Sequence, residues 1–184
     1  MTAIGLALPG QESFGYTARV GPSLLQIRSL SLAALLFLLG GAACGERVPA
    51  QEADGVPREL LAIETVAGAR HEFRVEIADT IEERSQGLMF RSEMAADAGM
   101  LFEYAERQYI TMWMANTVLP LDMVFIAASG RILNIAERTV PQSRAPIPSA
   151  GLAVAVLELN AGTASRLGLA PGDLVLHGFF GTVE

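Results

Sequence analysis

Short segments of alternating or continuous apolar residues run through the chain from about residue 60 onward. Phe73, Val75 and Ile77 alternate with charged residues, and this two-residue period is typical of a half-buried strand. Residues 152–159 are almost continuously apolar, which predicts a strand buried on both faces. Further strands are predicted at residues 60–66, 100–104, 108–114, 121–126, 131–135 and 174–177.

Two short helices are predicted between these strands. Thr80 and Glu83 have the spacing of a capping box, and Gly87 can end the helix that we place at residues 81–86. The second helix is expected at residues 161–167. Connections of hairpin length favour antiparallel pairing over alternating parallel units. We therefore expect an α+β, β-rich fold: a compact, mostly antiparallel sheet or a partly closed barrel with two short helices.

The N-terminal region predicts an export signal. The apolar run at residues 30–39 follows Arg19 and Arg28, and it is shorter than the roughly 20 residues that a membrane-spanning helix needs. Small residues and then Cys44 come next, in partial agreement with the lipobox of bacterial lipoproteins, although Gly41 stands where that motif usually has leucine. Lipidation of Cys44 is the favoured interpretation, and ordinary signal-peptidase cleavage is the alternative.

The chain is expected to have three parts. Residues 1–43 form the export signal, residues 44–57 form a short polar tether containing proline and glycine, and residues 58–184 form a single globular domain. A lipid on Cys44 would hold this domain at a membrane through its N-terminus. The expected location is therefore the periplasm or the cell envelope.

Composition excludes several classes of function. The 184 residues include 20 acidic and 13 basic residues, for a formal net charge of −7, which argues against nucleic acid as a partner. One cysteine and two widely separated histidines leave no disulfide framework, no cysteine-rich zinc site and no HExxH motif. The sequence also lacks G-x-S-x-G and Walker motifs. Neither a metal ion nor a cofactor is expected.

Three polar residues, Asn116, Thr117 and Asp122, lie in the most apolar part of the domain. An unpaired polar group costs about 1–3 kcal/mol when it is buried, so each needs a partner. One explanation is structural: Asn116 and Thr117 bind the backbone of a tight crossover, and Asp122 pairs with an arginine such as Arg91 or Arg138.

The other explanation is a ligand site. Asn116, Thr117, Asp122 and Arg91 could converge on a polar ligand in a cleft, with Trp113 as a stacking surface. The structural explanation is favoured for Asn116 and Thr117, and both remain open for Asp122.

Glu158 is the one charged residue in the apolar segment 152–159. With Asp122 it could form the carboxyl pair of a hydrolase acting on a glycosidic bond. The methionines of this region are interpreted as core packing rather than as ligands. They are Met89, Met100, Met112, Met114 and Met123.

Several linked motifs resemble one known family. They are Gly87-Leu-Met-Phe-Arg91, Gly99-Met-Leu-Phe102, Trp113-Met-Ala-Asn-Thr117, Pro120-Leu-Asp122, Val156-Leu-Glu158, Ala161-Gly162 and Pro171-Gly-Asp173. In this order they resemble the domain of unknown function 192 (DUF192) family of small, often exported prokaryotic proteins, over about residues 60–178. Ala115 departs from the family, which often has a basic residue there. The resemblance implies a single β-rich domain and supplies neither a reaction nor a catalytic residue.

Three functions follow as hypotheses. The first is a non-enzymatic accessory domain at the envelope that binds a small polar or glycan-like ligand, or a partner protein, beside Asn116 and Asp122. The second is a carbohydrate-acting hydrolase that uses Asp122 and Glu158. The third is a purely structural protein, in which Asp122 is sealed away from any pocket.

Overall fold

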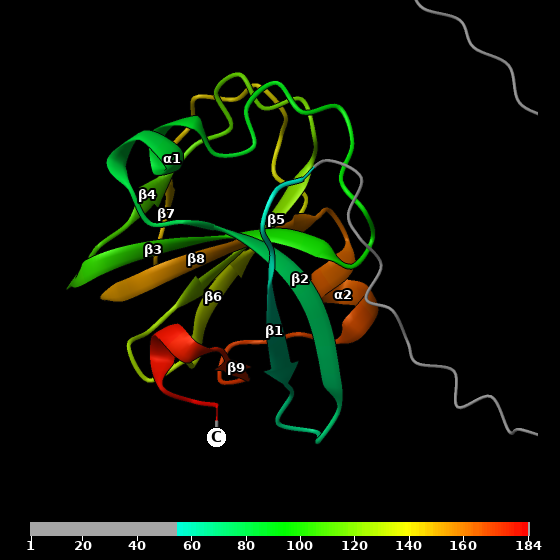
Figure 1. Ribbon diagram of the computed structural model, residues 1–184, viewed down its shortest axis with the longest axis vertical. Coiled ribbons are helices and arrows are strands. Elements are labelled where there is room, and N and C mark those ends of the chain that lie inside the picture. The colour runs from blue at the N-terminus through cyan, green and yellow to red at the C-terminus, as the bar shows by residue number, and fades with distance from the viewer. Residues whose placement is uncertain (1–54, 184) are drawn as a thin grey trace, which may run out of the picture. The chain divides into compact units, whose positions relative to one another are not determined.

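The computed structural model describes residues 55–183 (Figure 1). The chain divides into Met1–Arg47 and Val48–Glu184, and the second unit contains every element described below. The expected export signal at residues 1–43, Cys44 and most of the tether lie outside the described residues.

Nine strands and two α-helices make up the described domain. The predicted α+β, β-rich fold is therefore confirmed. In chain order the elements are β1 (Glu59–Glu64), β2 (Arg70–Ala78), α1 (Ile81–Gln86), β3 (Ala98–Gln108), β4 (Thr111–Met112), β5 (Leu121–Ile126), β6 (Ile132–Ala136), β7 (Ile147–Pro148), β8 (Ala153–Asn160), α2 (Thr163–Leu167), β9 (Leu174–Leu176) and the 3-10 helix η1 (Gly178–Phe180).

Local sequence signals account for the first elements. β1 and β2 lie where two strands were predicted, and they form an antiparallel hairpin with Leu61 opposite Phe73. Helix α1 begins with the predicted capping box: the Thr80 hydroxyl accepts from the Glu83 amide, and the Glu83 carboxylate accepts from the Thr80 amide. The amide of Gly87 then bonds the carbonyl of Glu83 and ends the helix.

Seven strands form one curled sheet in the order β6-β5-β8-β3-β2-β1-β9. Most neighbours are antiparallel, as expected, and β2 and β3 form a parallel pair. The reason is that α1 and the loop after it carry the chain from the end of β2 back to the start of β3, which is a crossover rather than a hairpin.

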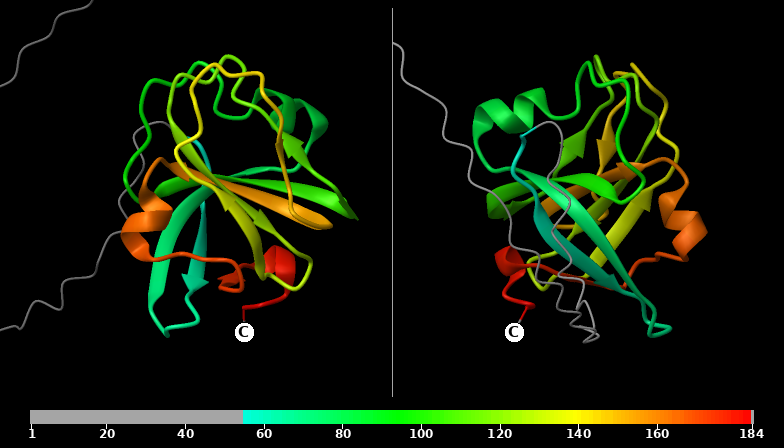
Figure 2. Two further views of the ribbon diagram at one scale, coloured as in Figure 1. Left: turned by 180° about the vertical axis from the view of Figure 1, so that it is seen from behind. Right: turned by 45° about the vertical axis from the view of Figure 1, so that its right-hand side comes forward.

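The two ends of the sheet come together, as the views in Figure 2 show. Arg131, just before β6, forms an isolated bridge with Leu174 of β9. The amide of Ile132 donates to the Asp173 carbonyl at 2.9 Å, and the amide of Val175 donates to the Gly130 carbonyl at 2.8 Å. The predicted partly closed barrel is thus confirmed.

Residues 108–114 differ from the prediction. β3 continues to Gln108, and only Thr111 and Met112 remain as the short strand β4. Its partner is β7, and Thr111 pairs with Pro148. Proline has no amide hydrogen to donate, so this small second sheet does not extend.

The sheet has an apolar cluster on each face. The inner cluster, inside the curl, includes Leu61, Val124 and Leu157. The outer cluster includes Phe102, Met123 and Val156, and it is covered by α1, β4 and β7 (Figure 1). β8 is buried along both faces, as predicted, because it lies between β5 and β3 with a cluster on either side.

Candidate functional site

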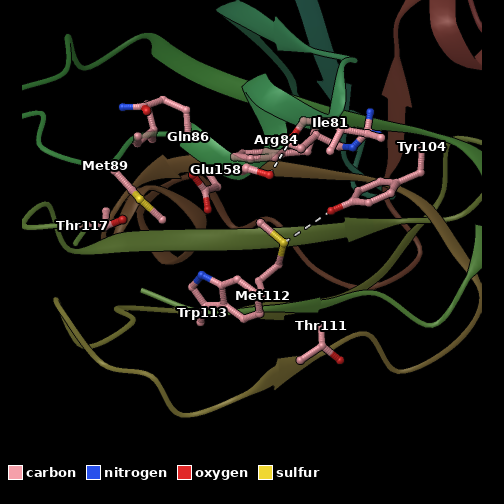
Figure 3. A pocket seen from close by; sticks show the side chains of 14 residues that line it. Ile81, Arg84, Gln86, Met89, Tyr104, Thr111, Met112, Trp113, Thr117 and Glu158 are labelled. Atoms are coloured by element: carbon pink, nitrogen blue, oxygen red, sulfur yellow. Dashed lines mark hydrogen bonds between the residues drawn. The ribbon is translucent and has the colours of Figure 1, made fainter. Parts of the chain in front are cut away.

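A pocket opens between helix α1 and the outer face of the sheet (Figure 3). Its volume is about 220 Å³. We call it the Glu158 pocket, because the Glu158 side chain points into it from β8. Its lining residues are Ile81, Arg84, Ser85, Gln86, Gly87, Leu88, Met89, Phe102, Tyr104, Thr111, Met112, Trp113, Thr117 and Glu158.

Glu158 is a buried acid without a partner. Only 4% of the residue is exposed, and its side chain makes no hydrogen bond or ion pair to any residue in the range 55–183. Its neighbours across the sheet are apolar, with Met100 opposite on β3 and Met123 opposite on β5. Burial raises the pKa of the Glu158 carboxyl to about 8. The carboxyl is therefore mostly protonated at neutral pH, and the pocket has a neutral acid as its floor.

The walls of the pocket combine thioethers with aromatic rings. Met89 and Met112 lie on either side of the Glu158 carboxyl, and Trp113 lies next to Met112 (Figure 3). Trp113 is 56% exposed, so the wall that it forms is open to solvent. The Tyr104 hydroxyl lies 3.8 Å from the Met112 sulfur. These groups are polarisable and electron-rich, which suits contact with positive or weakly polar ligand groups.

Arg84 occupies the other end of the pocket. Its guanidinium lies over the Tyr104 ring, with the central carbon 5.0 Å from the ring centroid. It also donates to the backbone carbonyl of Asp79 and, at 2.8 Å, to that of Glu103. Burial raises the pKa of Tyr104, and the nearby Arg84 charge opposes this effect. Arg84 is thus held by Tyr104 and two carbonyls, and it forms no ion pair with Glu158.

Asp122 has a structural role. It is fully buried, and its two oxygens accept from the backbone amides of Arg138 at 2.8 Å and Ala164 at 2.9 Å. The second bond caps helix α2, whose own N-cap residue, Gly162, has no side chain to do so. The ion pair with an arginine side chain, which was one of the two explanations for Asp122, is wrong, because the bond from Arg138 comes from its backbone. Asp122 does not line the Glu158 pocket.

The proposed carboxyl pair of Asp122 and Glu158 is wrong. In the register between β5 and β8, Glu158 lies opposite Met123, whereas Asp122 lies opposite Leu159. Residues directly opposite each other point to the same face, and successive residues point to opposite faces. The two carboxyls therefore lie on opposite sides of the sheet and cannot flank one glycosidic bond.

Arg91 also lies away from the predicted cleft. Its guanidinium binds the Glu76 carboxylate through two bonds of 2.6 Å each, and Arg58 binds one of the same oxygens at 3.1 Å. Burial pushes the pKa of Glu76 upward, but the bonds and charges of the two arginines outweigh burial and lower it. Arg91 serves this ion-pair network, and the expected convergence with Asn116 and Asp122 does not occur.

Asn116 and Thr117 form the tight crossover of the structural explanation. Asn116 adopts a positive φ of 56°, a conformation that asparagine tolerates better than most residues. Its carbonyl accepts from the Phe90 amide at 2.9 Å, and its exposed side chain lies near the Met89 sulfur. Thr117 does line the pocket, although its hydroxyl bonds the Ala115 carbonyl at 3.3 Å.

Of the six candidate residues, the structure places Trp113, Thr117 and Glu158 at one pocket. Sequence reasoning missed Arg84 and Tyr104, and it assigned Met89 and Met112 to the core. No local signal marks Arg84 or Tyr104, because they meet only after β2, α1 and β3 are assembled. Within residues 55–183, no group of three acidic, histidine or cysteine side chains is placed to hold a metal ion.

Solved structures with the same fold come from two bacteria. A Sinorhizobium meliloti 1021 protein, described as a proposed transcription regulator, is 48% identical, with a TM-score of 0.65, and the match covers 66% of this chain and 95% of that one. A Novosphingobium aromaticivorans DSM 12444 protein of unknown function is 43% identical, with a TM-score of 0.63, and the match covers 67% of this chain and 87% of that one. No curated protein matches the chain.

A family model covers the same part of the molecule. It matches residues 62–177, from β1 to the residue after β9, and its description is "Uncharacterized ACR". The match spans more than half of the chain and includes every motif quoted above that lies in β3, β5 and β8. The chain belongs to the DUF192 family.

Proposed function

We propose that this protein is an exported accessory domain of the cell envelope that binds a small polar ligand in the Glu158 pocket and catalyses no reaction. The observation that supports it is the buried Glu158 carboxyl, which points into an open pocket without a protein partner. The Glu158 oxygens are not among the side-chain atoms that are sealed from solvent without a partner, so they can be reached from the pocket, and a ligand that enters it can bond them directly.

The ligand is small. At roughly 30 Å³ for each water molecule in the liquid, a pocket of about 220 Å³ has room for about seven water molecules. A single sugar ring or a smaller polar compound matches this size, whereas an oligosaccharide would have to extend into solvent past the exposed Trp113. We therefore place only one terminal group of any larger ligand inside the pocket.

A non-enzymatic role is favoured over hydrolysis. The carboxyl pair that the hydrolase hypothesis requires is split across the sheet. The groups around Glu158 are thioethers, aromatic rings and one arginine that is held by carbonyl groups. None of them is a general base within reach of a nucleophile. The pocket has the composition of a binding site.

Export and lipidation complete the proposal. The apolar run at residues 30–39 and Cys44 support a lipid anchor that precedes the domain by a short tether. In addition, no helix within residues 55–183 is long and apolar enough to cross a membrane. We expect the full chain, expressed in a bacterium with two membranes, to fractionate with membranes and to incorporate labelled palmitate. The Cys44→Ala variant should lose the label, and a wild-type chain that stays in the cytosol would contradict export.

Ligand binding is tested by the methionine methyl signals in NMR. Met89 and Met112 line the pocket, whereas Met94 lies outside it and serves as an internal control. The unit Val48–Glu184, labelled with ¹³C at its methionine methyls, would be titrated with neutral sugars, amino sugars, small amides and small ammonium compounds. We expect at least one class to shift Met89 and Met112 but not Met94. If no class shifts them, the binding function is wrong.

A further inference from the structure

The chemistry of the Glu158 pocket narrows the class of ligand, and this inference rests on the proposed binding function. Glu158 is the one acid among the lining residues, and its only ionisable neighbours in the pocket are Arg84 of α1 and Tyr104 of β3. A neutral ligand could be bound equally well by glutamine, which donates and accepts hydrogen bonds and adds no cost of ionisation. A carboxyl differs from glutamine in that it can become an anion, which a positive ligand group would stabilise.

The side walls also suit a positive group. Trp113, Met89 and Met112 surround the space in front of the carboxyl (Figure 3). Aromatic faces attract cations through the ring quadrupole, with tryptophan the strongest, and thioether sulfurs are polarisable. An organic ammonium ion would place its charge at the carboxyl and its carbon substituents against these walls.

Arg84 does not compete for the carboxyl. Its guanidinium is held over Tyr104 and bonded to the carbonyl of Glu103 at 2.8 Å. Burial is the cause of the raised pKa of Glu158. Glu158 thus lacks a cationic partner within the described domain. The formal charge of −7 on the chain further favours the approach of cations.

We propose that the ligand of the Glu158 pocket is a small organic ammonium ion whose charge pairs with Glu158 and whose substituents pack against Trp113, Met89 and Met112. Choline is a suitable probe, because its seven non-hydrogen atoms match a pocket with room for about seven water molecules. Ethanolamine tests the primary ammonium group in the same size range.

The release of a proton on binding determines whether the affinity rises or falls with pH. The empty pocket holds a protonated carboxyl at neutral pH, so binding a cation releases that proton to solvent and leaves the carboxylate paired with the ligand. The affinity for an ammonium ion should therefore rise with pH, by about tenfold for each unit, and level off above the pKa of about 8. A neutral ligand that accepts a hydrogen bond from the acid would show the opposite trend.

The decisive experiment compares choline with 3,3-dimethylbutan-1-ol, a neutral compound of the same shape, by the methyl signals of Met89 and Met112 in the unit Val48–Glu184. We expect choline or ethanolamine to shift both signals, more strongly at pH 8 than at pH 6, and the neutral compound to shift them at least tenfold more weakly. Equal shifts from choline and the neutral compound would overturn the proposal, as would a choline affinity that falls with rising pH.

Two variants test whether the Glu158 carboxylate is the group that pairs with the ammonium ion. Glu158→Gln should keep the pocket shape and lose both the choline shifts and their pH dependence. Glu93→Gln changes an exposed acid outside the pocket and should bind as wild type does. If neutral sugars or amides shift Met89 and Met112 while ammonium compounds do not, the ligand class is wrong and the binding function stands. If no compound shifts them, both are wrong.

Discussion

Glu158 and Asp122 are buried acids of adjacent strands, and their partners give them different roles. Asp122 accepts two backbone hydrogen bonds, whereas Glu158 faces a pocket with no partner among the described residues. A buried carboxylate that accepts hydrogen bonds supports the fold, and one without them stays protonated. The two side chains can therefore be told apart by how they affect stability.

The Glu158→Gln variant should change the pH dependence of stability. The pKa of Glu158 is about 8 in the folded state, against an ordinary value of 4.5 that the unfolded chain should approach. Between these values the folded protein holds a proton that the unfolded chain releases. Wild-type stability should therefore fall as pH rises from about 4.5 to about 8, by about 1.4 kcal/mol per unit from this group, and flatten above that range.

Urea unfolding of both proteins at intervals from pH 5 to pH 9 measures this effect. The difference in unfolding free energy, variant minus wild type, should increase steadily up to about pH 8, because the glutamine does not titrate. A difference that stays constant across the range would show that Glu158 ionises normally in the folded protein.

Removing Asp122 should destabilise the domain strongly. Asp122→Ala leaves the buried amide of Ala164 and the amide of Arg138 without their acceptor. At about 1–3 kcal/mol for a buried donor, the Ala164 amide alone should lower the unfolding free energy by about 1–3 kcal/mol, and the part-buried bond from Arg138 adds to this loss. Asp97→Ala changes an exposed side chain and should have little effect. Equal urea midpoints for the two variants would contradict the structural role of Asp122.

At the scale of single residues, the sequence predicted where polar groups would be unusual but not which of them would find partners. Glu158 and Asp122 both stand out as acids within apolar segments. Asp122 accepts from the amides of Arg138 and Ala164, whereas Glu158 has no partner among the described residues. Only the assembled fold determines this difference. The pairing of Arg91 with Glu76 is likewise a contact between residues that are distant in sequence.

At the scale of elements, strands and caps were predicted well wherever the signal is local. The capping box at Thr80 and the doubly buried strand β8 depend on residues that are close in sequence. The parallel pairing of β2 with β3 was missed, because it depends on how the chain crosses over after α1. The length of β4 was overestimated, since Ile110, Met112 and Met114 pack onto the outer cluster without joining the main sheet.

Close contact between β3 and β8 beneath the pocket makes Gly99 sensitive to substitution. A Cβ atom at Gly99 would lie 2.7 Å from the backbone oxygen of Glu158 and 2.9 Å from Leu159. Because backbone cannot move aside as a flexible side chain can, Gly99→Ala must separate the two central strands. We expect a loss of about 1–3 kcal/mol in unfolding free energy, as in other overpacked cores.

Gly151→Ala is the matched control for this prediction. A Cβ atom at Gly151 meets only Leu133, at 3.8 Å, which is an ordinary contact. The control should leave the urea midpoint unchanged or raise it slightly, since alanine restricts the unfolded chain. If both variants unfold at the same urea concentration, β3 and β8 are not as tightly packed as the structure indicates.

At the scale of the whole molecule, closure of the curl joins residues from both ends of the domain. β9 pairs with β1 on one side and meets the turn before β6 on the other, through the bridge between Arg131 and Leu174. The inner apolar cluster is enclosed by this closure, while the Glu158 pocket lies on the outer face. Stability and ligand binding therefore depend on different faces of one sheet.

Gly130 tests the closure directly. Its φ is +78°, and a Cβ atom there would lie 2.8 Å from the Val175 backbone oxygen, so Gly130→Ala combines backbone strain with a clash at the junction. Gly168 has a similar φ of +70° with nothing within 4 Å, so Gly168→Ala reports the strain alone, about 1–2 kcal/mol. Gly130→Ala should cost more than this control.

Amide hydrogen exchange shows where the additional loss in Gly130→Ala arises. The amides of Val175 and Ile132 form the junction, and they should exchange faster relative to the amide of Leu157 at the centre of β8 than they do in wild type. The Met89 and Met112 methyl signals should stay unchanged, because the pocket lies on the other face of the sheet. If the two glycine variants lose equal stability and the junction amides keep their protection, the two ends of the sheet do not meet in solution as they do in the structure.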